Sequence, residues 1–145
     1  MKYLYQRDPK WAGITLGSSN RTLAQVGCTT TCISMSSDYF GCYLDPGSCA
    51  KRLSYTDDAR ILWGSIGTTF LTMAFLWREY KYNQPLISEA IKNPAKTCLL
   101  NVNNGGHWVL ALKELGFGKY WVCDPWDGNR KIYSGVVGCS VLKMK

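Results

Sequence analysis

Cys28 is the side chain with the clearest capacity for chemistry, because it follows a glycine and precedes the predicted first turn of a helix. Residues at three- and four-residue spacing predict a helix over Thr29–Phe40, and Gly41 is a natural stop. A thiol at a helix N-terminus meets unpaired backbone amides and the positive end of the helix dipole, which favour the thiolate. Cys28 is therefore a candidate nucleophile, provided that a base lies near its sulfur.

His107 is the only histidine in the chain, and it directly follows two glycines at the start of an apolar run. An imidazole with an ordinary pKa of about 6.5 takes a thiol proton at neutral pH and returns it to a leaving group. A lone histidine beside Trp108 is equally compatible with a buried or a surface role. His107 is nevertheless the only imidazole that could serve Cys28 as a base.

Asp124 ends the next apolar run, Tyr120–Cys123, and is followed by Pro125. On a strand next to that of His107, its carboxylate could approach the ring nitrogen that does not face the sulfur, which would fix the tautomer and stabilise the imidazolium. Asp-Pro is also a turn signal in its own right. The order cysteine, histidine, acid makes the set more informative than its separate members.

The first half of the chain predicts an arm and short helices that would position Cys28. Residues 3–17 are rich in turn formers and predict a weakly structured arm, and residues 18–25 predict a helical turn before Gly27, which permits a bend. A further short helix is predicted over Pro46–Leu53. Residues 54–82 combine helical spacing with glycines and with β-branched and aromatic residues, so their type stays open.

The second half predicts a helix and then strands. The helix over Pro85–Asn93 precedes an antiparallel hairpin, in which Thr97–Val102 and His107–Leu112 flank a turn at Asn103–Gly106. Further strands are predicted at Tyr120–Cys123, Ile132–Tyr133 and Val136–Leu142. Helices followed by an antiparallel sheet indicate the α+β class, and 145 residues fit a single domain, 1–145.

The composition is that of a basic globular protein. Seventeen Lys and Arg against ten Asp and Glu give a net charge of +7, which suits an acidic partner such as an anionic cell-wall polymer. No basic run is interleaved with stacking aromatics, so we do not expect nucleic-acid binding. We also expect no signal peptide and no membrane span, because no apolar run approaches the roughly 18 residues that a span needs.

Seven cysteines are many for this length, but the number is odd and the spacing shows no regular framework. Mostly buried, inert thiols in a reducing compartment are the simpler interpretation. A structural zinc site is the alternative, but Cys28, Cys32, Cys42 and Cys49 lack the usual knuckle spacing in their second half. We therefore predict neither a metal nor a cofactor.

A series of short segments accompanies these residues in a fixed order: Gln6–Ala12, Leu16–Gly17, Thr22–Leu23, Gly27–Thr31, Ser34–Met35, Gly106–Ala111 and Tyr120–Gly128. Together they resemble the papain-like cysteine peptidases, and most closely the branch related to bacteriocin-processing, double-glycine-leader peptidases in a free-standing bacterial or phage form. The resemblance covers both ends of the chain and hardly touches residues 54–82.

The resemblance implies a papain-like fold with a nucleophile at a helix N-terminus, followed by an antiparallel sheet. It implies Cys28 as the nucleophile, His107 as the general base and then acid, and Asp124 as the orienting acid. Such enzymes cleave amide bonds through a thioester and need no metal or cofactor. These implied roles coincide with the three residues that the sequence singles out on chemical grounds.

Papain-like enzymes also use a glutamine amide to hold the developing oxyanion, an interaction that is complete only in the transition state. This glutamine usually lies six residues before the cysteine, and here Thr22 occupies that position. Gln6, which matches the glutamine of the related family's opening motif, is the first candidate for the role. Gln25 is the second candidate, although it lies only three residues before Cys28.

The function that follows is a cysteine-dependent amide-bond hydrolase, either a general peptidase or a phage or bacterial lysin that cleaves peptidoglycan peptides. We expect it in the cytoplasm of the producing cell or in a virion, with the positive charge aiding approach to a cell wall. A transglutaminase-like acyl transferase uses the same residue order but passes the acyl group to an amine. A non-catalytic binding protein on the same fold is the third alternative.

Overall fold

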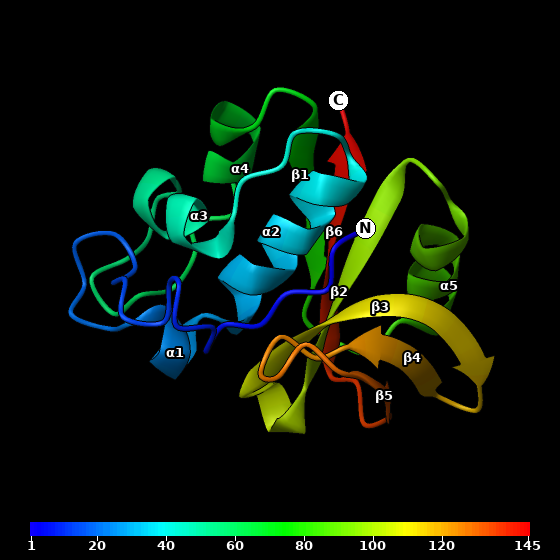
Figure 1. Cartoon of the computed structure of the whole chain (residues 1–145). Coiled ribbons are helices and arrows are strands. Elements are labelled where there is room, and N and C mark those ends of the chain that lie inside the picture. The colour runs from blue at the N-terminus through cyan, green and yellow to red at the C-terminus, as the bar shows by residue number, and fades with distance from the viewer.

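The computed structural model describes all 145 residues and has the α+β architecture that the sequence predicts. None of its helices is long and apolar enough to cross a lipid bilayer. The elements, shown in Figure 1, are α1 Leu23–Val26, α2 Cys28–Tyr39, α3 Pro46–Arg52, α4 Ser65–Thr69, β1 Met73–Glu79, α5 Gln84–Lys92, β2 Lys96–Val102, the 3-10 turn η1 Asn103–Gly105, β3 His107–Gly116, β4 Lys119–Cys123, β5 Arg130–Tyr133 and β6 Gly138–Met144.

The strands form one six-stranded antiparallel sheet in the order β1-β6-β2-β3-β4-β5. The predicted hairpin is confirmed, since β2 pairs with β3 and Val102 lies opposite His107. Strand β4 returns along β3 with Cys123 opposite Leu110. Because neighbouring antiparallel strands run in opposite directions, the start of β3 and the end of β4 lie at the same end of the sheet.

Helices cover both faces of this sheet (Figure 1). Helix α2 packs against β3, with α3 against α2 and α4 against β1, whereas α5 packs against β2 and β3. The side chains of β2 alternate between these layers, because Leu99 joins the cluster of Ile33 and Leu100 joins the cluster of Ile87. Burial on both faces makes β2 a rigid centre for the sheet, and α2 rests on one side of it.

Helix α2 is buried along much of its length despite its polar composition. Small side chains let neighbouring elements come close, and most of their hydroxyls find partners, whereas the buried Oγ1 of Thr31 has none. Ser34 Oγ donates to the carbonyl oxygen of Leu44 at 2.6 Å, and Ser36 Oγ lies 2.9 Å from the hydroxyl of Thr97 on β2. Buried polar groups are tolerated when they are hydrogen-bonded in this way. The bond to Thr97 fixes α2, and with it Cys28, against the sheet, and the bond to Leu44 fixes the chain that follows the helix.

The predicted N-terminal arm packs along the molecule. Trp11 and Leu16 are buried with Leu23 of α1. The backbone N–H of Gln6 donates to the carbonyl oxygen of Pro125 at 2.7 Å, just after β4. The arm therefore connects α1 with the loop that contains Asp124.

Residues 54–82, whose type the sequence leaves open, contain both a helix and a strand. Ile66 lies in α4, whereas Met73 and Trp77 lie in β1, which pairs with the C-terminal strand β6. The helical spacing of the apolar residues here does not mark one continuous helix. A register shift between Phe75 and Trp77 interrupts the two-residue alternation that normally identifies a strand.

Candidate active site

Cys28 is the first residue of α2 and follows Gly27. Gly27 has a φ of −87°, an angle open to any residue, so the bend into Cys28 does not use the wider backbone freedom of glycine. A Cβ at Gly27 would instead lie 2.5 Å from the carbonyl oxygen of Leu23 and 2.6 Å from its Cδ2. Glycine is required because α1 and α2 approach closely, and this approach sets the position of the thiol.

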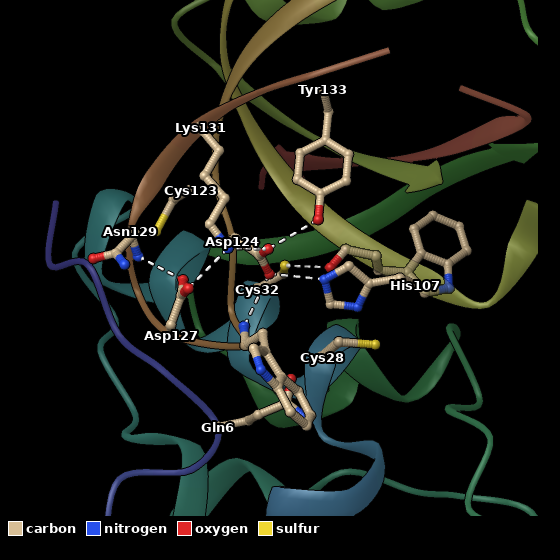
Figure 2. Close-up of polar contacts among 12 residues, drawn as sticks. Gln6, Cys28, Cys32, His107, Cys123, Asp124, Asp127, Asn129, Lys131 and Tyr133 are labelled. Atoms are coloured by element: carbon tan, nitrogen blue, oxygen red, sulfur yellow. Dashed lines mark hydrogen bonds and ion pairs between the residues drawn. The ribbon is translucent and has the colours of Figure 1, made fainter. Parts of the chain in front are cut away.

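His107 begins β3 directly after the turn η1, in which Asn104 and Gly105 have φ angles of 55° and 94°. Asn101 Nδ2 holds this turn by donating to the carbonyl oxygens of Gly105 at 3.2 Å and His107 at 3.0 Å. The imidazole lies between the carboxylate of Asp124 and the side chain of Cys28 (Figure 2). The turn therefore brings the only histidine of the chain to the N-terminus of α2.

Asp124 follows β4, and only 3% of its side chain is exposed. Its Oδ1 accepts hydrogen bonds from His107 Nε2 at 2.7 Å and from the backbone N–H of Trp126 at 3.0 Å. Its Oδ2 accepts from Lys131 Nζ and Tyr133 Oη, both at 2.9 Å (Figure 2). Each oxygen has two donors, so the carboxylate is held in one orientation. With Nε2 bound to Asp124, the Nδ1 edge of the ring is left for Cys28.

The pKa values of Cys28 and His107 shift in opposite directions. Burial raises the pKa of Cys28, but the hydrogen bond and charge of His107, with hydrogen bonds from the Trp108 backbone and the Thr29 side chain, bring it below its ordinary 9.0. Burial lowers the pKa of His107, but hydrogen bonds to Asp124 and Cys28 and their charges raise it to about 9. Both shifts favour a thiolate facing an imidazolium at neutral pH.

The donors around Asp124 keep their protons and the carboxylate stays ionised. Burial raises the pKa of Asp124, but hydrogen bonds from His107, the Trp126 backbone and Lys131 hold it well below 3.8. Lys131 also lies 2.8 Å from Asp127, and its hydrogen bonds to both carboxylates raise its pKa. Burial and the hydrogen bond to Asp124 raise the pKa of Tyr133. The network is therefore charged and fully hydrogen-bonded over a wide pH range.

Gln6, the first candidate for the oxyanion role, lines the same cavity as Cys28. Its Nε2 donates to the carbonyl oxygens of Leu23 and Ala24 at 3.2 Å each, while its buried Oε1 has no partner. An amide rotation would place Oε1 against those two carbonyls, which is unfavourable. The Gln6 side chain therefore links the N-terminal arm to α1, and its N–H groups are already bonded to backbone carbonyls instead of being directed at an oxyanion.

Gln25, the second candidate, also lines the cavity and forms a capping box with Thr22. Its Oε1 accepts from the backbone N–H of Thr22 at 3.0 Å, and Thr22 Oγ1 accepts from the backbone N–H of Gln25 at 3.3 Å. The position where the family resemblance expects a glutamine is thus a helix cap. Binding through Oε1 leaves the amide nitrogen of Gln25 for an acceptor in the cavity.

A cavity of about 500 Å³ opens at Cys28 and His107. The arm, the end of α1, the start of α2, strand β1 and the β2–β3 turn all contribute to its walls. Its lining is Gln6, Leu16, Gln25, Val26, Cys28, Thr29, Thr30, Tyr55, Ala59, Arg60, Ile61, Trp63, Arg78, Gly105, Gly106, His107, Trp108 and Trp126. The size suits a short peptide segment, and the tryptophans supply apolar walls.

The other cysteines lie outside this arrangement. All seven are free thiols, with Cys42 half-buried and Cys32, Cys49, Cys98, Cys123 and Cys139 buried. Burial, with the charges of Cys28, Cys123 and Asp124, raises the pKa of Cys32 well above 9.0. No group of three or more His, Cys, Asp or Glu side chains is placed to hold a metal ion.

Sequence reasoning missed Lys131, Tyr133 and Arg78. Lys131 and Tyr133 are two residues apart in β5 and share one face, so strand alternation could have indicated that both face Asp124. Arg78 lies in the region whose structure stayed open, and no sequence signal linked it to Cys28. The structure thus brings together the three residues predicted from the sequence and adds partners on β5 and β1.

No protein-family model and no curated protein matches this chain. Function is inferred from the placement of Cys28 and His107, whose pKa values are shifted, beside one cavity with the buried carboxylate of Asp124 behind the imidazole.

Proposed function

We propose that this protein is a cysteine-dependent amide-bond hydrolase with a papain-like arrangement of Cys28, His107 and Asp124. The observation that carries the proposal is geometric: Cys28 at the start of α2 and His107 line one cavity, and His107 Nε2 donates to the buried Asp124 at 2.7 Å. The pKa shifts agree with it, since His107 lowers the pKa of Cys28 and Cys28 helps to raise that of His107. Structural thiols and structural histidines rarely need such coupling, whereas a nucleophile and its base do. The cavity beside them gives a substrate access to the sulfur.

In the first half of the reaction, the thiolate of Cys28 attacks the carbonyl carbon of the amide and the C=O electron pair moves to oxygen. When the tetrahedral intermediate collapses, the C–N bond breaks and the imidazolium of His107 gives its proton to the leaving amine. The products are a thioester on Cys28 and a neutral imidazole. Asp124 keeps the ring oriented and stabilises its charged form throughout.

In the second half, the neutral imidazole of His107 removes a proton from water while the water oxygen attacks the thioester. Collapse of the second intermediate breaks the C–S bond and releases the carboxylic acid. Cys28 returns as a thiolate and His107 as an imidazolium. The atoms and charges therefore balance without a metal or cofactor.

The oxyanion would be held by the backbone N–H of Cys28, because the first N–H groups of a helix have no partner within the helix. Gln25 supports this role better than Gln6, since the Gln6 donor is directed at Leu23 and Ala24. Both glutamines line the cavity. We propose Gln25 as the side-chain donor and Gln6 as the residue that fixes α1.

We propose peptides as the substrates, with peptidoglycan peptides favoured by the charge of the molecule. A net charge of +7 attracts the protein to an anionic cell-wall polymer, which raises the local concentration of substrate. An acyl transferase would use the same residues and release the acyl group to an amine. A binding protein would keep the cavity and show no turnover.

The test compares the wild type with Cys28→Ala and with Cys42→Ala, which removes a half-buried thiol outside the cavity. Purified peptidoglycan and casein are incubated with each protein, and new amino groups are counted by a fluorescent amine reagent. We expect release by wild type and Cys42→Ala, and a loss of at least about 1000-fold in Cys28→Ala. Equal release by Cys28→Ala would refute the proposal.

The same assay separates the alternatives. An added alkylamine that appears on the acyl product, at the expense of hydrolysis, would indicate a transferase. No release from either material, with both folded proteins binding peptidoglycan alike, would indicate a binding protein. Hydrolysis of only one material would identify the substrate class.

A further inference from the structure

Arg78 is a charged residue in the cavity that neither the fold nor the proposed reaction explains. It lies on β1 and lines the same cavity as Cys28 and His107. Its Nε is buried and has no hydrogen-bond partner, and the guanidinium makes no ion pair with any carboxylate of the chain. A buried donor without an acceptor is costly, so its presence beside a candidate nucleophile needs an explanation.

Aromatic rings hold the guanidinium of Arg78 in place. Its central carbon lies 4.3 Å from the ring centroid of Tyr80 and 5.1 Å from that of Trp108. Trp63 supports Trp108 from the side, with ring centroids 5.5 Å apart. Cation–π contacts orient a guanidinium by its faces and leave the N–H groups at its edge for an acceptor. Arg78 is therefore positioned without using its hydrogen-bond donors.

Apart from the Cys28 thiolate, every charged side chain that lines the cavity is a cation. Arg60 and Arg78 line it together with His107, and no aspartate or glutamate does. The partner of Arg60 is Asp58 at 3.2 Å, in a pair that is largely exposed and therefore weak. A water-accessible cavity lined by cations, one of them unpaired, attracts an anion. The planar edge of a guanidinium matches a carboxylate, to which it can donate two parallel hydrogen bonds.

We propose that Arg78 binds a carboxylate of the substrate, so that the cavity takes peptides with an acidic side chain or a free C-terminus close to the bond that Cys28 attacks. This inference rests on the proposed function, because it concerns the substrate of the same site. Arg78 contributes by recognising and positioning the substrate, and it takes no part in the bond-breaking steps.

The test uses two alkylating reagents of nearly equal size, iodoacetate and iodoacetamide, which differ in carrying a carboxylate or a neutral amide. Rate constants for modification of Cys28 are measured by mass spectrometry at low ionic strength, and the ratio of the two is compared between variants. Arg78→Gln should lower the iodoacetate to iodoacetamide ratio about three- to tenfold, because a nearby positive charge is lost. Arg78→Lys, which keeps the charge, should retain most of the ratio.

Arg52→Gln is the matched control, since it removes the same charge from an exposed position at the end of α3, outside the cavity. We expect its ratio to equal that of the wild type. An Arg78→Gln ratio equal to that of Arg52→Gln would overturn the inference. A wild-type Cys28 that iodoacetamide does not modify selectively would instead overturn the proposed function, so the two failures can be told apart.

A second experiment measures how far peptides protect Cys28 of the wild type against iodoacetamide. It identifies the source of the carboxylate and does not depend on the folding of a variant. The probes are acetyl-Ala-Ala-Glu-amide against acetyl-Ala-Ala-Gln-amide, and acetyl-Ala-Ala-Ala with a free C-terminus against its amide. If the glutamate peptide slows iodoacetamide labelling more than the glutamine peptide does, Arg78 binds a side-chain carboxylate. If the peptide with a free C-terminus slows labelling more than its amide does, Arg78 binds the carboxylate of a chain end. Equal protection by acid and amide in both pairs would contradict the inference.

Discussion

At the scale of single residues, the proposed chemistry depends on how Cys28 and His107 shift each other's pKa. Burial alone would raise the pKa of Cys28 and lower that of His107, which would leave both groups neutral. The interaction of each group with the other reverses both effects, and the hydrogen bond from His107 to Asp124 adds to the rise in the pKa of His107. The two opposed shifts predict a thiolate–imidazolium pair, whose protonation states can be measured directly.

His107 can be titrated by NMR without assignment ambiguity, because it is the only histidine. We expect its ring resonances to report a pKa of about 9, raised from 6.5. Asp124→Asn and Cys28→Ser should each lower this value, since each removes a negative partner of the imidazolium. Catalysis should need the thiolate and the imidazolium together, so activity should fall in acid as Cys28 is protonated and fall again as the pH rises through about 9.

The same shift has a consequence for stability. Because the folded pKa of His107 lies above its unfolded value, the pairing stabilises the fold fully below a pH of about 6.5 and the contribution is lost as the pH rises through about 9. His107→Ala should therefore lose more stability against urea at pH 6 than at pH 9.5. A deficit that does not depend on pH would show that the raised pKa is absent.

We expect Tyr133 to act as a positioning residue through its hydrogen bond to Asp124. Tyr133→Phe removes one of the two donors to Oδ2 and leaves Lys131 and the apolar ring. We expect kcat to fall about three- to tenfold with little change in KM, because the ring orientation is loosened and the substrate contacts are not. The NMR pKa of His107 should move as well, which a merely structural role would not cause. Tyr3→Phe, on the exposed part of the arm, is the matched control.

At the scale of elements, the site depends on short connections that were only partly predictable. The helix start at Cys28, the hairpin turn before His107 and the strand end at Asp124 follow from local sequence signals, and the structure confirms these positions. The role of Gly27 could not be predicted, because it comes from contact with Leu23 and not from its own backbone angles. The place of Arg78 in the cavity could not be predicted for a similar reason, because β1 is defined by its pairing with the distant strand β6.

Gly27→Ala tests the close approach of α1 and α2. The added Cβ would lie 2.5 Å from the Leu23 carbonyl oxygen, so the helices must separate. We expect a loss of about 1–3 kcal/mol in the free energy of unfolding, or roughly 2–10 °C in Tm, together with slower alkylation of Cys28. Gly13→Ala is the control, because a Cβ there meets nothing within 4 Å. Equal effects of the two substitutions would contradict the steric role.

At the scale of the whole molecule, the sheet order brings distant parts of the chain to one cavity. The arm joins α1 to the loop after β4, α2 supplies Cys28, and β1 places Arg78 in the same cavity. The class of fold could be predicted from the succession of helices and strands. The insertion of β6 between β1 and β2 could not, because pairing between the middle and the end of the chain leaves no local signal.

The net charge of +7 makes a prediction about binding to anionic surfaces. Cosedimentation of Cys28→Ala with purified cell walls should be strong at low salt and weaken steadily as sodium chloride rises, since the Debye length falls from about 10 Å at 0.1 M to about 3 Å at 1 M. Cys28→Ala is used so that the walls stay intact. Binding that is unaffected by salt would show that the overall charge does not drive the association.

Activation of Cys28 by His107 is tested most directly by the relative reactivity of the seven thiols in the native protein. Limiting iodoacetamide at a pH of about 6.5, followed by mass spectrometry of the labelled peptides, ranks them within one sample. We predict labelling of Cys28 at least about tenfold faster than that of the half-buried Cys42, and loss of this preference in His107→Ala. Labelling of Cys28 no faster than Cys42, or a preference that survives in His107→Ala, would contradict the account of a thiolate activated by His107.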